Sequence, residues 1–243
     1  IFQVPPLWLP FQAPDVWDRL YWENFPRAVE FIPFVQYLQN TLWIAVLSAL
    51  GVFLTAPLVA YSLARIRWPG RDVLFAITIA TLFLPFHVTL IPLFLIYRNL
   101  GLANTPWPLI IPHWVGGAFY IFLLRQFFMT IPQELSEAAR IDGAGEFRTY
   151  WQIILPLAKP ALATIVLFQF LASWREFLGP LIYLRNKEQF TLSLGLTQFR
   201  SEWDVEWNLL MAASVLITFP VIVLFFFAQR QFIQGITLTG IKG

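Results

Sequence analysis

The sequence predicts an all-α polytopic membrane protein with five membrane-spanning helices, and two observations lead to this prediction. First, 58% of the 243 residues are hydrophobic, only 12% are charged, and the mean hydropathy is +0.65. Soluble domains carry roughly 25% charged residues, so this composition is typical of a protein that lies in a bilayer. Second, five apolar stretches each reach the roughly 17–25 residues that a spanning helix needs, and they lack the strict alternation of a transmembrane β-strand.

The chain opens with a polar, aromatic and proline-rich segment, residues 1–40, which we expect to end in a short interfacial helix over residues 29–39. Membrane helices tolerate the prolines and glycines of the later stretches, because neighbouring helices satisfy the freed backbone groups. The first residue is Ile1 rather than Met, and we expect the natural N-terminus, with one more span, to precede it. A transmembrane domain follows over residues 41–243, with spans at residues 41–64, 73–97, 107–124, 160–184 and 208–229.

Lys and Arg set the predicted orientation, because loops rich in these residues remain in the cytoplasm. The loops on the side of residues 1–40 hold six basic residues, namely Arg19, Arg27, Arg98, Arg185, Lys187 and Arg200. The loops on the opposite side hold nine, namely Arg65, Arg67, Arg71, Arg125, Arg140, Arg148, Lys159, Arg230 and Lys242. The sequence therefore predicts that residues 1–40 are external, and that the loop at residues 131–159 and the C-terminus are cytoplasmic.

The loop at residues 131–159 is the one long polar break between spans. A helix is expected after Pro132, because proline suits a first helical turn and the acidic residues that follow complement the helix dipole. The glycines at positions 143 and 145 then interrupt it, and a second helix is expected over residues 146–154 until Pro156 ends it. Physical chemistry alone leaves open an ordinary amphipathic connector that lies on the bilayer surface.

The motif within this loop is more specific than its amphipathic pattern. Glu137-Ala138-Ala139, followed by Asp142-Gly143 and then by Ile-x-Leu-Pro at residues 153–156, resembles the EAA loop of ABC importer permeases. Arg175 stands where the carbohydrate importer branch of that family commonly carries Asn. Other segments are similar to this branch, which includes the second membrane subunit of maltose transporters, at residues 40–42, 64–71, 91–93, 100–105, 229–235 and 240–243.

The resemblance implies a type I permease with six spans in the inner or plasma membrane of a prokaryote. Such a chain forms half of a translocation pathway for a sugar or oligosaccharide, beside a second homologous permease subunit, two ATPase subunits and an external solute-binding protein. It is not an enzyme and binds no cofactor, because ATP and Mg are held by the ATPase chains. The resemblance also implies that the coupling contacts with the ATPase are made by Glu134, Glu137, Ala138, Ala139, Arg140, Asp142 and Gly143.

The motifs in the chain are consistent with ATP binding by separate subunits. The chain has no G-x-x-x-x-G-K-[ST] motif to cradle ATP phosphates, no cysteine for a thiolate metal site, and nothing that indicates a nucleic-acid partner. Within the fourth span, Trp174, Arg175 and Glu176 are candidates for a pathway or gate, because intramembrane charges usually face a cavity or each other. The alternative is a pair that snorkels to the outer interface. His87 lies between two prolines in the second span. We expect it either to line the pathway or to donate a hydrogen bond to a backbone carbonyl that a proline leaves without a partner.

Other functions remain open from the sequence. An ion-coupled secondary transporter needs intramembrane carboxylates, and Glu176 alone qualifies. A membrane-embedded enzyme would need an acid–base or metal cluster, and no such spacing occurs in the spans. An ABC permease for a non-sugar solute is the nearer alternative. The aromatic and acidic loop at residues 199–207 suits a sugar, a binding protein or an aromatic belt at the membrane surface.

Overall fold

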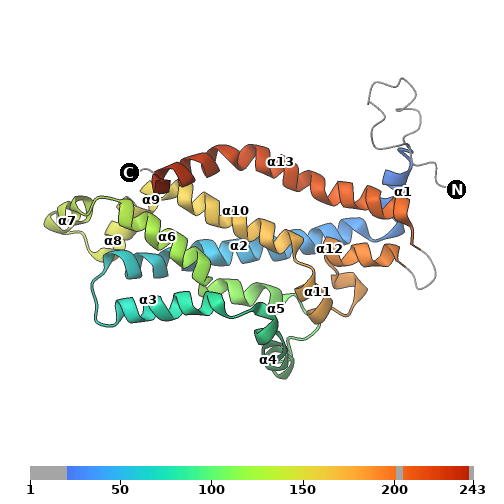
Figure 1. Ribbon diagram of the computed structural model, residues 1–243, viewed down its shortest axis with the longest axis horizontal. Coiled ribbons are helices and arrows are strands. Elements are labelled where there is room, and N and C mark those ends of the chain that lie inside the picture. Colours follow the sequence, from blue (N-terminus) through green and yellow to red (C-terminus); the bar gives the residue numbers. More distant parts are fainter. Residues whose placement is uncertain (1–20, 201–204, 241–243) are drawn as a thin grey trace, which may run out of the picture.

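The described chain is helical and elongated, with its long helices running along one axis (Figure 1). The computed structural model describes the backbone of residues 21–200 and 205–240, and side chains as far as residue 226. Within these residues there is no β-strand, and the all-α prediction is confirmed. Three helical segments are long and apolar enough to cross a membrane, and two bent helix pairs bring the number to as many as five. The straight candidates are Phe34–Arg65, Trp107–Thr130 and Trp207–Phe226.

Helix α2 (Phe34–Arg65) lies at the centre of the fold, and several later helices pack against it (Figure 1). Its inward face is built from small residues, among them Ala45, Ala49, Gly51, Ala56 and Ala60, all of which are buried. Small residues allow close approach between membrane helices. The segments that pack closely against this face of α2 are η2 (Ile111–Val115), α6 (Ala118–Thr130) and α10 (Lys159–Arg175).

Two glycines mark close contacts between α2 and the segment that contains η2. A Cβ added at Gly51 would lie 2.6 Å from the side chain of Trp114, and one added at Gly116 would lie 3.3 Å from the backbone of Ala56. Gly116 also has a φ of +70°, a left-handed conformation that L side chains rarely adopt. This turn breaks the third predicted span between η2 and α6, and α6 continues to Thr130 rather than ending at residue 124.

The second predicted span, residues 73–97, is a broken helix rather than a continuous one. It consists of two halves bent by 99°. Pro85 causes the bend, because the residue before a proline is disfavoured in the helical region, and Leu84 is indeed extended. The halves are α3 (Arg71–Ala80) with the short η1 (Thr81–Phe83), and α4 (Phe86–Asn99).

The fourth predicted span is shorter than expected, because α10 ends at Arg175 and α11 (Leu178–Tyr183) turns away. Pro156 does not end the helix before it. The chain continues through Pro156 and bends by 78° near Ala158 instead. The segment before the bend comprises α8 (Glu146–Thr149), the π-helical η3 (Tyr150–Ile154) and α9 (Leu155–Leu157).

The interfacial helix predicted at residues 29–39 is absent, because Pro33 divides that segment. α1 (Asn24–Phe31) lies before the proline, and α2 begins directly after it. The remaining elements are η4 (Lys187–Gln189), α12 (Leu192–Gly195), η5 (Leu196–Phe199) and α13 (Trp207–Gly240). α13 packs along α1 and α10.

Two buried clusters hold these helices together. One joins α2, α6, η3 and α10, and its largest fully buried side chains include Phe128, Leu124 and Ile154. The other joins α1, the start of α2, the end of α10 and α13, around Tyr37 and Phe199. The first cluster supports the loop between α6 and α10, and the second supports the opposite end of the molecule.

The contact between Gly116 and α2 leads to a stability prediction. We expect Gly116→Ala to lower the temperature at which the detergent-solubilised protein unfolds by more than Gly101→Ala does. Both glycines have positive φ, so both alanines cost about 1–2 kcal/mol of backbone strain, but only residue 116 also meets the backbone of α2. The measurement is the fraction of monodisperse protein after graded heating, and equal losses in the two variants would contradict the prediction.

Candidate functional site

The loop between α6 and α10 projects from one end of the molecule, with α7 (Glu134–Ile141) at its tip (Figure 1). Most of the residues predicted to couple to an ATPase are open to a partner there, namely Glu134, Glu137, Ala138, Arg140, Asp142 and Gly143. Ala139 differs, because it is only 6% exposed and packs within the chain together with Ser136. Of the two alanines of the motif, Ala138 is therefore the one that another protein can contact.

Gly143 ends α7 in a Schellman motif. Its N–H donates to the carbonyl of Arg140 at 3.0 Å, and the N–H of Ala144 donates to the carbonyl of Ala139 at 2.8 Å. This motif needs a left-handed residue after the helix, and Gly143 has a φ of +79°. Gly145 is extended and has no such requirement. The turn at Gly143 therefore sets the angle between α7 and α8.

Arg140 is engaged within its own chain. Its guanidinium donates to Oε1 of Glu146 from Nη2 at 2.6 Å and from Nε at 3.1 Å, and the hydroxyl of Tyr61 donates to Oε2 of the same carboxylate at 2.8 Å. Partial burial raises the pKa of Glu146, but the hydrogen bonds from Arg140 and Tyr61 outweigh this effect and bring the pKa below its ordinary value. Glu146 is therefore ionised at neutral pH.

Two further arginines fix the base of the loop to the helices. Arg65, buried at the end of α2, donates from Nη2 to the carbonyls of Ile131 and Pro132 at 2.6 and 3.3 Å. Arg125 on α6 donates to the carbonyl of Leu63 at 3.1 Å. These bonds satisfy carbonyls that helix ends leave without partners. They make the loop and the ends of α2 and α6 one connected structure.

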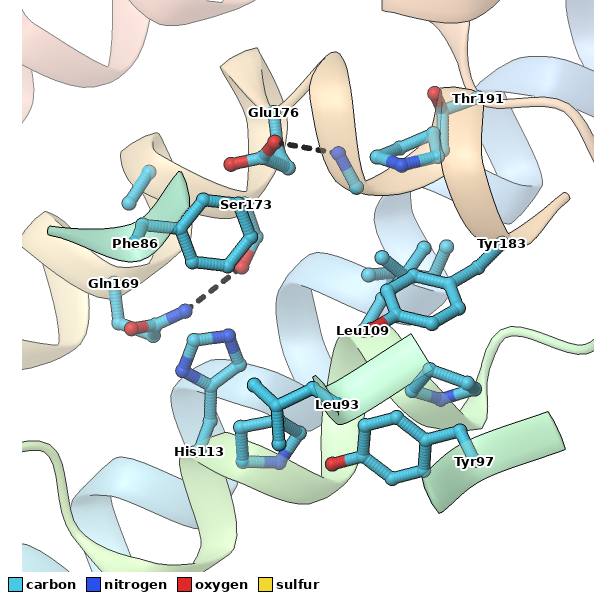
Figure 2. Close-up of a pocket in the computed structure, with 16 residues that line it drawn as sticks. Phe86, Leu93, Tyr97, Leu109, His113, Gln169, Ser173, Glu176, Tyr183 and Thr191 are labelled. Carbon is cyan, nitrogen blue, oxygen red and sulfur yellow. Dashed lines mark hydrogen bonds between the residues drawn. The ribbon is translucent and has the colours of Figure 1, made fainter. Parts of the chain in front are cut away.

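A cavity of about 350 Å³ lies near the opposite end of the molecule, between α2, α4, α10, α11 and the short helix α5 (Trp107–Ile110) with η2. Its polar groups include the amide of Gln169, which is 2% exposed and donates to the hydroxyl of Ser173 at 2.8 Å. Figure 2 shows the imidazole ring of His113 directed across the cavity toward these two residues. The rings of Tyr97 and Tyr183 pack edge to face at its side.

The structure separates the residues predicted for a pathway. Glu176 lines the cavity, just beyond the end of α10, and its Oε1 accepts a hydrogen bond from the N–H of Gly179 at 2.9 Å (Figure 2). Arg175 is exposed, and its Nε donates to the carbonyl of Leu171 at 3.3 Å. His87 is also exposed and is not a lining residue, although its neighbour Phe86 is.

Trp174 departs from the expectation that it lines a pathway. It is only 3% exposed, and its indole N–H donates to the carbonyl of Ile217 on α13 at 3.2 Å. Its ring stacks on Phe170, with the centroids 5.7 Å apart. Trp174 therefore joins α10 to α13 as part of the second buried cluster.

Sequence reasoning missed most of the cavity. His113, Gln169, Ser173 and the two tyrosines come from elements that are distant in the chain and that only the fold brings together. One local signal was present, because Gln169 and Ser173 are polar residues four positions apart in an apolar helix and so share a face. Among the residues that the structure describes, no group of three or more His, Asp or Glu could hold a metal ion. Residues 201–204 of the aromatic and acidic loop lie outside the described residues.

Comparisons with known proteins agree with this architecture. Residues 54–238 match the family model described as "Binding-protein-dependent transport system inner membrane component". The chain is 37% identical over 204 residues to the arabinooligosaccharides transport system permease protein AraQ of Halalkalibacterium halodurans, and the aligned region covers 84% of this chain and 73% of that protein. It is 33% identical over 225 residues to the diacetylchitobiose uptake system permease protein NgcG of Streptomyces coelicolor, and the aligned region covers 91% of this chain and 74% of that protein.

Two further comparisons extend these matches. The chain is 33% identical over 240 residues to the sn-glycerol-3-phosphate transport system permease protein UgpE of Yersinia pestis, and the aligned region covers 97% of this chain and 84% of that protein. A solved chain from a bacterial ABC transporter involved in the import of the acidic polysaccharide alginate superposes with a TM-score of 0.76 at 28% identity. That match covers 87% of this chain and 79% of the solved chain.

The fold and the cavity define a polytopic helical membrane protein with a largely apolar cavity between its helices, into which a few polar side chains project. The chain belongs to the family of binding-protein-dependent transport system inner membrane components, which are ABC transporter permeases. It is thus a transport subunit that acts in a membrane-embedded complex with other subunits. The resemblance to permeases of the carbohydrate importer branch is confirmed.

The position of Trp174 generates a prediction that separates packing from transport. Trp174→Phe keeps an aromatic ring but removes the bond to the Ile217 carbonyl, so we expect it to lower stability by about 0.5–1.5 kcal/mol. Transport by the protein that remains folded should be unchanged. Thermal unfolding in detergent and transport in proteoliposomes are the measurements, with the exposed Trp151→Phe as the matched control. A transport defect in well-folded Trp174→Phe would return this residue to the pathway.

Proposed function

We propose that this chain is one of two membrane subunits of an ATP-driven importer for a neutral sugar or oligosaccharide, which an external binding protein delivers. Its EAA loop receives the motion of a separate ATPase. The observation that carries this proposal is the surface of the loop. Ile141 is 87% exposed and Phe147 is 72% exposed, on a segment that carries many charged residues and projects beyond the helices. Exposed apolar side chains with a polar surround are typical of a protein interface.

The bend between α3 and α4 supports a second membrane subunit. Leu84 and Pro85 form irregular backbone, and the apolar side chains around them are exposed, Phe83 most of all. Non-helical backbone within a bilayer is tolerated where it is buried in protein or lines a water-filled cavity, because lipid offers no hydrogen bonds. A homologous permease packed against this face covers the bend, and the two chains then enclose a pathway that neither forms alone.

The cavity supports a hydroxyl-rich, neutral solute. Amide, hydroxyl and imidazole groups supply hydrogen bonds, and the tyrosine rings supply flat apolar faces. Among its described lining residues there is no Lys or Arg, and Glu176 is the one carboxylate. The relatives named above transport arabinooligosaccharides, diacetylchitobiose or sn-glycerol-3-phosphate, according to their names. A cavity with an acid and no fixed cation favours the first two chemistries over a phosphate ester.

The mechanism that we propose is a rigid-body movement. With the loop in the cytoplasm and residues 1–40 outside, the ATPase subunits, which hold ATP and Mg, bind α7 and displace it when they close. Because α7 is joined to both α6 and α10, its displacement rotates those helices. The cavity lies at the other end of α10, so the same rotation opens it to one side of the membrane and closes it to the other.

The exposed tip of α7 can be tested by assembly. We expect Ile141→Ser to release the ATPase from the affinity-purified complex, because it removes the most exposed apolar contact of the loop. Leu100→Ser is the matched control, since Leu100 is 65% exposed at the other end of the molecule and should leave the complex intact. The measurement is the ATPase-to-permease ratio after purification. Retention of the ATPase by Ile141→Ser would rule out this tip as a docking surface.

A second test addresses the solute. In proteoliposomes that contain the whole complex and its binding protein, we expect labelled arabinotriose to be imported in preference to sn-glycerol 3-phosphate. Gln169→Leu should lower that uptake by about tenfold, the equivalent of one lost hydrogen bond to the solute of about 1.4 kcal/mol. Thr164→Val, on the same helix but outside the cavity, is the control. Preferential uptake of the phosphate ester would contradict the assignment to neutral sugars.

A further inference from the structure

Glu146 connects three elements that are separate in the chain. It begins α8, it binds Arg140 on α7 through Oε1, and it accepts the hydroxyl of Tyr61 on α2 through Oε2. Tyr61 is only 4% exposed and belongs to the first buried cluster, where its ring packs against Tyr150 and Phe128. One carboxylate therefore links the projecting loop to the central helix of the fold, and Figure 1 shows α8 beside the end of α2.

This link supplies a connection that the covalent chain lacks. The backbone joins α7 to α6 on one side and to α8, α9 and α10 on the other, but not to α2. Arg65 ties α2 to the start of the loop at Ile131 and Pro132. Glu146 ties it to the far side of the loop, after the turn at Gly143. With both ties in place, α2 contacts the loop at two separated points, so α7 cannot pivot about either one alone.

The energies indicate that this link acts on geometry rather than on stability. The Arg140 and Glu146 side chains are 51% and 41% exposed, and ion pairs that are this accessible to water add little to stability. The single hydrogen bond from Tyr61 also makes only a modest net contribution. Neither interaction decides whether a chain of this size folds. Both are directional, however, and together they fix the loop relative to a buried ring that has little freedom to move.

We propose that Glu146 is a positioning residue that locks α7 onto the end of α2, so that a displacement of α7 moves α2 together with α6 and α10. Because α2 lines the cavity through Ile44, this lock carries the motion of the loop to a second wall of the cavity besides α10. The inference rests on the proposed function, in which an ATPase displaces α7. It assigns no contact with the ATPase to Glu146 or to Tyr61.

The experiment uses the complete transporter complex in proteoliposomes and needs no knowledge of the solute. The chain contains no cysteine, so Ala172→Cys places a single thiol in it, at an exposed position that lines the cavity. A membrane-impermeant cationic thiol reagent is added outside, with and without ATP and vanadate, and its attachment to this chain is measured by mass spectrometry. The ATPase rate and the ATPase-to-permease ratio are recorded on the same samples.

The variants separate the hydrogen bonds from the packing around them. Tyr61→Phe removes only the hydroxyl that binds Glu146, and Tyr150→Phe removes the hydroxyl of a buried tyrosine whose ring packs against Tyr61, as the matched control. Glu146→Leu removes both bonds. Glu146→Gln is the conservative rescue, because its amide oxygen accepts from Arg140 while its NH₂ group donates to the Tyr61 hydroxyl.

In the otherwise unchanged complex we expect ATP and vanadate to alter the labelling rate by about fivefold or more, the lower end of usual coupling between sites. Tyr61→Phe and Glu146→Leu should reduce this change to less than half, while ATP hydrolysis and bound ATPase stay as before. Glu146→Gln and Tyr150→Phe should keep it. The double variant Tyr61→Phe/Glu146→Leu should be no worse than Glu146→Leu, because both changes break one link.

A full labelling response in both Tyr61→Phe and Glu146→Leu would overturn the inference. Loss of the ATPase from Tyr61→Phe would also overturn it, because Glu146 would then support the docking surface instead of transmitting its motion. An absent response in the unchanged complex, or retention of the ATPase by Ile141→Ser, would overturn the proposed function itself. The failure of the lock and the failure of the proposed function are thus distinguishable.

Discussion

Close packing against α2 is the constraint on which both the cavity and the loop depend. In a bilayer no hydrophobic force draws helices together, since lipid tails are as apolar as Leu, and association relies on close van der Waals contact and a few hydrogen bonds. The face of α2 that carries small residues provides that contact, with Gly51 against Trp114 and Ala56 against Gly116. Because η2 approaches α2 so closely, His113 on the same short helix is held at the wall of the cavity.

The arginines near the loop make hydrogen bonds within the chain, in addition to indicating its predicted orientation. Arg65, Arg125 and Arg140 count among the residues that predict the orientation of the chain, and each also makes a specific hydrogen bond within it. Two of them bind backbone carbonyls, and the third binds Glu146. A guanidinium keeps its charge at any physiological pH and presents several fixed donors. Lysine in their place would preserve the predicted orientation but not these hydrogen bonds.

The sequence predicts some features well because the forces behind them are local. Span positions follow from the length of apolar runs, and the hinge at Gly143 follows from a Schellman motif that involves only six neighbouring residues. The bend at Pro85 has a local cause too, but its 99° angle depends on contacts between spans. The cavity escaped prediction because its lining comes from several elements, and the bond from Trp174 to Ile217 escaped it because the two residues lie 43 positions apart.

The broken helix at Leu84 and Pro85 has a consequence for the life of the chain before assembly. If the proposed second permease covers this bend, a newly inserted subunit that lacks it leaves the irregular backbone facing lipid, where each unsatisfied polar group costs several kcal/mol. The same feature that shapes the finished transporter thus marks an unpaired subunit as incomplete. In the proposed assembly, an unpaired subunit would be less stable in the membrane than an assembled one, so the supply of the partner would set how many subunits persist.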